Sequence, residues 1–69
     1  MDIEEAAVAV LREAGEPLHW TVIQDRALRA GYVDPFVITD IRGKLLAALA
    51  AAARSGRVSR RGKGVYELP

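Results

Sequence analysis

The densest group of charged side chains in this sequence lies in its closing stretch, RVSRRGKGVYELP. Four cations fall within seven residues: Arg57, Arg60, Arg61 and Lys63. The guanidinium group of arginine matches phosphate oxygens in a bidentate geometry, and the release of counterions drives such a cluster toward a polyanion. Glycines on both sides of Lys63 let the backbone approach another surface closely. The stretch therefore predicts phosphate contacts. The alternative is a hairpin whose edge cations only keep it unpaired and soluble.

A second group of candidate contacts lies on the expected third helix, in the part that would enter the major groove of DNA. Opposite its apolar stripe, only Thr39 and Lys44 can donate a hydrogen bond to a base or a phosphate. Arg42 would be the obvious base reader, but on one continuous helix it falls on the apolar side. It either reaches out to solvent or the helix breaks at Gly43. Asp40 would repel a phosphate backbone, so we expect weak reading of base sequence.

The residues needed for catalysis or metal binding are almost absent. His19 is the only histidine and there is no cysteine, so a metal site would need carboxylates for which no ligand spacing exists. Ser55 and Ser59 have no base nearby in the sequence, and the GKG turn lacks the spacing of a phosphate-binding loop. Trp20 could stack on a ligand, although covering a small core is its more common role. We therefore expect no enzyme activity, cofactor, metal or small-molecule substrate.

The length and composition allow one small domain. The chain has 69 residues, about half of them apolar, which is enough for a core but leaves the fold only marginally stable. The net charge is +1, yet residues 1–34 carry −4 and residues 35–69 carry +5. Such a split suggests that one face meets an anion. It is also compatible with an ordinary solvated surface.

Nothing in the sequence indicates a membrane or a secretion route. The longest apolar stretch, Leu45–Ala53, is too short to span a bilayer, and the first residues carry acids where a signal peptide needs cations. The absence of cysteine favours a reducing compartment, so we expect a cytoplasmic location. Because the sequence stops at Pro69, directly after the last apolar position, we expect one module of a longer protein.

Two helices and a short strand are predicted in the first half. Asp2 and Glu5 form a capping box for a helix over 3–14, which Gly15 ends. Alternation over 18–20 predicts a short edge strand. Thr21 and Gln24 form a second capping box, which predicts a helix that starts at 22 and ends at Gly31.

A long helix and a hairpin are predicted in the second half. The third helix has two possible starts, Asp34–Pro35 and Thr39, and it ends before Gly56. Its inward stripe steps by three or four residues: Ile38, Ile41, Leu45, Leu49 and Ala52. Val58, a Gly-flanked turn and an apolar end predict two strands. With 18–20 as a third strand, the whole is an α+β winged helix-turn-helix: three helices on a small three-stranded antiparallel sheet.

The segments VLREAGEPLHWTVIQDRALRAGYV and RVSRRGKGVYELP resemble the opening and the closing hairpin of HARE-HTH domains, a branch of the winged helices. The resemblance covers nearly the whole chain, but the middle departs from it. The family has Thr-Pro ahead of helix 3 and aromatic residues further along it, whereas this chain has Asp34-Pro35 and then an alanine run. The resemblance implies a DNA-associated module joined to restriction-type nucleases, chromatin factors or an RNA polymerase accessory subunit.

The sequence thus favours a largely sequence-tolerant module for double-stranded DNA, with contacts from the hairpin and from helix 3. The expected contact residues are Thr39, Arg42, Lys44, Arg57, Arg60, Arg61 and Lys63. The alternative is a protein-docking winged-helix module, such as an accessory domain of an RNA polymerase or a nuclease. Its contacts would be the acidic face of the first helix and the alanine-rich face of the third, since small residues allow close approach.

Overall fold

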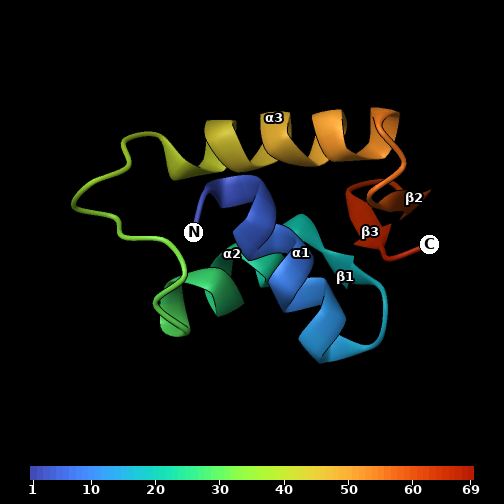
Figure 1. Cartoon of the computed structure of the whole chain (residues 1–69), viewed down its shortest axis with the longest axis horizontal. Coiled ribbons are helices and arrows are strands. Elements are labelled where there is room, and N and C mark those ends of the chain that lie inside the picture. The colour runs from blue at the N-terminus through green and yellow to red at the C-terminus, as the bar shows by residue number, and fades with distance from the viewer.

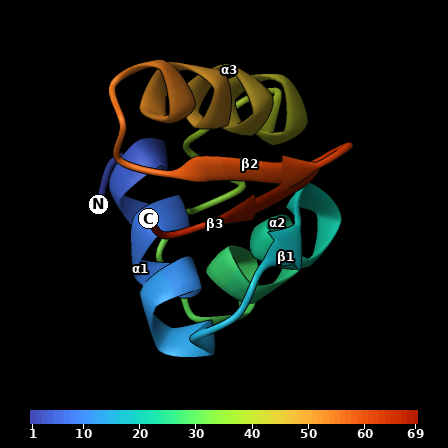
Figure 2. The same ribbon diagram turned by 90° about the vertical axis from the view of Figure 1, so that its right-hand side faces the viewer.

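The structure is a computed structural model that describes residues 1–69 (Figure 1). Its elements follow the order α1 (Ile3–Ala14), β1 (Leu18–His19), α2 (Trp20–Arg29), α3 (Ile41–Arg54), β2 (Ser59–Gly62) and β3 (Val65–Glu67). Helix α3 lies along one side of the molecule, over α1 and α2, and the hairpin of β2 and β3 lies beside the end of α3 (Figures 1 and 2). The predicted α+β architecture with winged-helix topology is confirmed.

Helix α1 is as predicted, because its ends are fixed by local hydrogen bonds. The backbone N–H of Glu5 donates to Asp2 Oδ1 at 2.8 Å, and Glu5 Oε1 accepts from the Asp2 backbone, which completes the capping box. Gly15 takes a left-handed conformation at φ +66° and ends the helix. The face between these ends is buried against the other helices.

Helix α2 begins two residues before the predicted start, so the predicted Thr21–Gln24 capping box is wrong. His19 is the cap instead: its Nδ1 lies 2.8 Å from Thr21 Oγ1 and accepts from the Thr21 backbone N–H at 3.3 Å. The helix therefore starts at Trp20, and the strand predicted over 18–20 is limited to its first two residues. Gly31 follows the helix at φ +77°, where the left-handed backbone stops it.

Helix α3 begins at Ile41, so both predicted starts, Asp34–Pro35 and Thr39, are wrong. The cap is Asp40, whose Oδ1 accepts from the Gly43 backbone N–H at 3.2 Å. The helix continues through Gly43 without a break, and Arg42 is exposed. The predicted stripe is confirmed in its helical part, since Leu45, Leu49 and Ala52 are buried. Ile41 is half-buried, and Ile38 packs on the core from the preceding loop.

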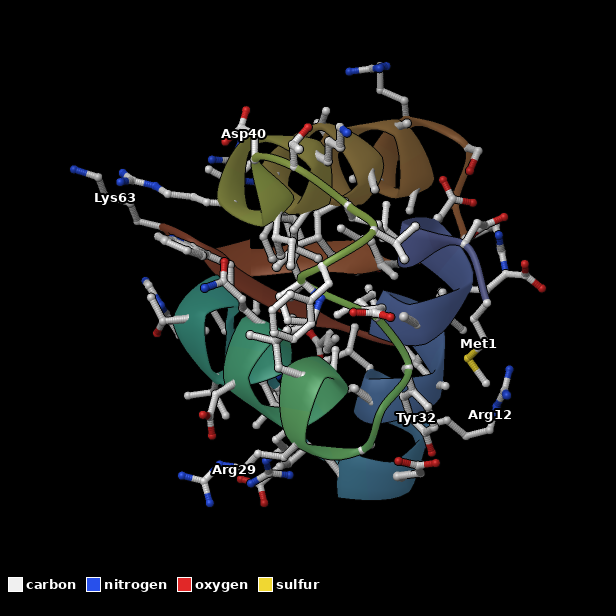
Figure 3. The ribbon with its side chains drawn as sticks, turned by 90° about the vertical axis from the view of Figure 1, so that its left-hand side faces the viewer. Met1, Arg12, Arg29, Tyr32, Asp40 and Lys63 are labelled. Atoms are coloured by element: carbon white, nitrogen blue, oxygen red, sulfur yellow. The ribbon has the colours of Figure 1, made fainter.

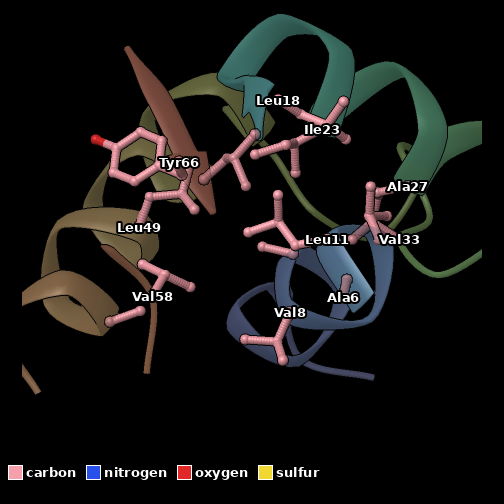
Figure 4. Packing of buried hydrophobic residues seen from close by; sticks show 14 residues of the cluster. Ala6, Val8, Leu11, Leu18, Ile23, Ala27, Val33, Leu49, Val58 and Tyr66 are labelled. Atoms are coloured by element: carbon pink, nitrogen blue, oxygen red, sulfur yellow. The ribbon is translucent and has the colours of Figure 1, made fainter. Parts of the chain in front are cut away.

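The strand predicted to complete the sheet does so. The order in the antiparallel sheet is β1-β3-β2, with Leu18 opposite Tyr66 and His19 opposite Val65. Buried side chains from the three helices and the sheet meet in one core, where Leu11 and Ile23 face Leu49 and Tyr66 (Figure 4). Val58 is buried, but it lies just ahead of β2 and not within the strand that was predicted to include it.

Candidate nucleic-acid interface

The tip of the hairpin forms an open hollow lined only by Arg60, Arg61, Gly62 and Lys63. All four residues are exposed, and Lys63 projects beyond the rest of the molecule (Figure 3). No apolar residue lines the hollow. An anion placed there would meet three cationic side chains and a stretch of backbone without a Cβ.

A β-bulge explains why neighbouring arginines share this hollow. Successive residues of a regular strand point to opposite faces. Here Arg60 pairs with Tyr66 and Gly62 pairs with Val65, so Arg61 is an extra residue in β2. A bulge bends the strand and re-aims side chains, and both Arg60 and Arg61 line the hollow.

The three cations differ in how far they are neutralised within the molecule. Arg61 Nη1 lies 3.2 Å from Glu67 Oε1 on the adjacent strand. Arg60 and Lys63 have no carboxylate partner. An exposed pair such as Arg61–Glu67 contributes little to stability, typically under ~1 kcal/mol, so Arg61 can exchange this partner for an anion at small cost.

Arg57 lies outside this hollow. Its guanidinium group forms an ion pair with Glu4 of α1, and its backbone N–H donates to Ala52 at the end of α3 at 2.8 Å. Arg57 therefore holds the start of the hairpin against the helices. Of the four cations expected on the hairpin, the structure brings three together at the tip.

Arg42 reaches the start of α2, close to the hairpin turn. Its guanidinium carbon lies 5.4 Å from the centroid of the Trp20 ring, within the range of a cation–π contact. The Trp20 backbone N–H donates to the Gly64 carbonyl at 2.9 Å. A Cβ at Gly64 would come within 2.8 Å of His19 Nε2 and 3.2 Å of Trp20 Cδ1, so only glycine fits this turn without displacing those rings. The first turn of α3, the first turn of α2 and the hairpin turn thus meet at one place.

The other two candidates on α3 do not join this group. Lys44 is exposed, but it lies two residues after Arg42 and so about 200° around the helix, on its other edge. Thr39 is exposed in the loop before the Asp40 cap. The structure therefore unites Arg42 with the hairpin and separates Thr39 and Lys44 from it.

Two residues of this place were not among the sequence candidates. Trp20 covers the core, which is the more common role of such a residue, since it is partly buried against the apolar cluster. His19 lies with its ring centroid 5.6 Å from that of Trp20. The signal available in the sequence was the adjacent pair of rings before a helix. The partner Arg42, however, becomes evident only when α2 and α3 are placed together.

The acids of α1, proposed as the protein-docking alternative, have partners within the chain. Glu4 pairs with Arg57, and Glu5 completes the capping box. Glu13 accepts a hydrogen bond from the Tyr32 hydroxyl, which raises the pKa of that phenol. Glu4 and Glu13 therefore hold other parts of the fold, and Glu5 holds the start of α1 itself.

No three His, Cys, Asp or Glu side chains gather where they could hold a metal ion. A second hollow, between α1 and β3, is lined by Leu11 and Leu68 and by residues that include Arg12, Glu16 and Glu67. None of the three helices is long and apolar enough to cross a bilayer.

No family model, curated protein or solved structure matches the chain.

Proposed function

We propose that this chain is a DNA-binding module that contacts the phosphate backbone of a duplex with little dependence on base sequence. The observation that carries the proposal is the hairpin hollow, which is lined by three cations and no acid. Phosphate oxygens are the common partner of such a cluster, because each neutralised phosphate releases bound counterions.

Arg42 supports the same proposal from a second element. Its contact with Trp20 holds the guanidinium group beside the hairpin turn before any ligand arrives, which lowers the conformational entropy lost on binding. In a winged helix the first turns of the third helix face the duplex. There, α3 offers Arg42 as its one long donor on the hairpin side, so the proposed contacts are to phosphates more than to base edges.

The experiment is a fluorescence-anisotropy titration of a labelled duplex at several salt concentrations. We expect binding at low salt, with log K falling linearly against log salt by about 0.9 for each phosphate neutralised. A second duplex of unrelated sequence should bind with a similar constant. An absence of binding at the lowest salt, where the electrostatic contribution is greatest, would overturn the proposal.

Membership of the HARE-HTH group, and with it a role beside a nuclease or polymerase, remains a proposal that rests on the two quoted segments. Protein docking is the second candidate function. The alanine-rich face of α3 has small, partly exposed side chains such as Ala47 and Ala51. A more specific observation in favour of protein docking is the exposed apolar turn before α3, which contains Phe36 and Val37.

A further inference from the structure

The loop between α2 and α3 is long. Residues 30–40 join the two helices, whereas a helix-turn-helix ordinarily needs three or four residues. Val33 is 4% exposed and Ile38 packs on the core, so the loop is anchored on both sides of its tip. It crosses the face shown in Figure 3, between Tyr32 and Asp40.

Asp34 builds the turn at the tip. Its Oδ1 accepts from the Phe36 backbone N–H at 2.9 Å, and its carbonyl accepts from Val37 and Ile38 at 3.1 and 3.0 Å. Pro35 fixes its own φ at the second position of the turn, directly after Asp34. The backbone of the tip is therefore held by its own hydrogen bonds, independently of what its side chains touch.

The side chains of this turn point away from the protein. Phe36 is 97% exposed and Val37 is 75% exposed, and Pro35 before them is exposed as well. Isolated apolar residues on a surface need no explanation, but three in a row on a built turn contribute nothing to the core. An aromatic anchor presented in this way is typical of a residue that fills a pocket on a partner.

The charges around the turn argue against two kinds of partner. Between Arg29 and Arg42 the only charged residues are Asp34 and Asp40. The Asp34 carboxylate accepts a hydrogen bond from the backbone N–H of Phe36, so a negative charge lies beside the exposed ring. Phosphates of DNA would be repelled there, as would an anionic lipid surface, which attracts basic segments.

A second copy of this chain is also a poor partner. Its two hollows are the cationic one at the hairpin, which has no apolar lining, and the one between α1 and β3, whose lining includes Arg12, Glu16 and Glu67. Neither is an apolar pocket for Phe36.

We propose that the turn of Pro35, Phe36 and Val37 inserts into a preformed apolar pocket of a different protein, and that Lys or Arg side chains rim this pocket. A concave pocket lets a few side chains supply most of the affinity. Cations on the rim would complement Asp34 and Asp40 and would guide the approach. The module would then bind DNA with the hairpin and a protein with this loop at the same time.

The test begins with a photo-crosslinking derivative of phenylalanine at position 36 of the full chain, in the cells that express it, with the same group at Val22 as control. Val22 is an exposed apolar residue of α2. The protein captured at 36 and not at 22 is identified by mass spectrometry, purified and titrated with the wild-type chain, with Phe36→Ser and with Val22→Ser. Both side chains are exposed, so both variants should fold, which circular dichroism checks.

We expect Phe36→Ser to bind the purified protein at least tenfold more weakly, Val22→Ser to bind like wild type, and added salt to weaken the complex. Duplex binding should be the same for all three chains, which separates this proposal from the DNA proposal. The proposal is overturned if nothing is captured selectively at 36, or if the captured protein binds Phe36→Ser equally well. The proposal is also overturned if the Phe36→Ser change abolishes one of three other interactions: dimerisation measured by sedimentation equilibrium, binding to duplex DNA, or flotation with phosphatidylserine vesicles. These results would show that Phe36 contacts a second copy, DNA or a membrane instead.

Discussion

Arg42 lies over the indole of Trp20, with the guanidinium carbon 5.4 Å from the ring centroid. The two residues are the second residue of α3 and the first of α2, so the contact ties the start of one helix to the start of the other. It also explains how Arg42 stays exposed although it lies close to the apolar stripe of α3. Its guanidinium group packs on the Trp20 ring at the edge of the core.

The contact can be followed through the only tryptophan of the chain. Arg42→Ala uncovers one face of the indole, so we expect emission at longer wavelength and stronger quenching by acrylamide. The loss of a cation–π contact at an exposed site should cost about 0.5–1 kcal/mol of stability. Lys44→Ala removes a charge from the other edge of α3 and should leave the emission unchanged. Equal spectra for wild type and Arg42→Ala would show that the two side chains do not stay in contact in solution.

The hairpin cations predict a specific change in the salt dependence of DNA binding. Changing Arg60, Arg61 and Lys63 together to alanine should reduce the slope of log K against log salt by about 3, at roughly 0.9 per phosphate contact. Arg57→Ala is the matched control. It removes the same type of charge from a position paired with Glu4, so the slope should change by much less. If the triple variant keeps the wild-type slope, another surface holds the DNA.

A change of Gly43 to alanine compares two effects on stability, the higher helix propensity of alanine and the clash of its Cβ with the Asp40 cap. Alanine in a helix is favoured over glycine by about 1 kcal/mol, yet a Cβ at this position would lie 2.3 Å from Asp40 Oδ2. We therefore expect Gly43→Ala to give no gain in the free energy of urea unfolding. In an Asp40→Gly background, where the carboxylate is gone and φ +52° suits glycine, the same change should gain about 0.5–1 kcal/mol. An equal gain in both backgrounds would contradict this interpretation.

The Asp2 cap predicts a loss of stability in acid. The hydrogen bond from the Glu5 backbone N–H lowers the pKa of Asp2 below its ordinary value of 3.8. The folded state is thus stabilised fully above that value, and this stabilisation disappears as the pH falls through the lowered pKa of the folded chain. Asparagine also caps helices but does not titrate, so Asp2→Asn should show a smaller fall in Tm from about pH 5 to about pH 2. Asp2→Ala, which lacks the cap, should be less stable already at neutral pH.

The core and the hairpin were predictable because they depend on periodicity. Leu45 and Leu49 repeat at the helical spacing, and the alternation around Tyr66 fits only one face of a strand, so the inward residues follow from the sequence alone. The addition of residues 18–19 to the hairpin as a third strand also followed from the sequence, because a lone hairpin is unstable.

The starts of α2 and α3 were not predictable, because several neighbouring residues can cap a helix. Asp34, Thr39 and Asp40 all suit the cap of α3, and burial of Val33 and packing of Ile38, both in the loop, decide among them. The same limit applies to the site. The cationic hairpin tip was evident from composition, whereas the pairing of Arg57 with Glu4 joins residues far apart in the chain.

β3 is synthesised after β1 and β2, yet it is the central strand of the sheet. Since β3 lies between β1 and β2, residues 18–19 have no strand to pair with until residues 65–67 have left the ribosome. The helices can form during synthesis, but the core they share stays open on the side that Tyr66 closes. Folding should therefore finish as one late step after synthesis of the hairpin, and a nascent chain stalled before Val65 should remain sensitive to protease.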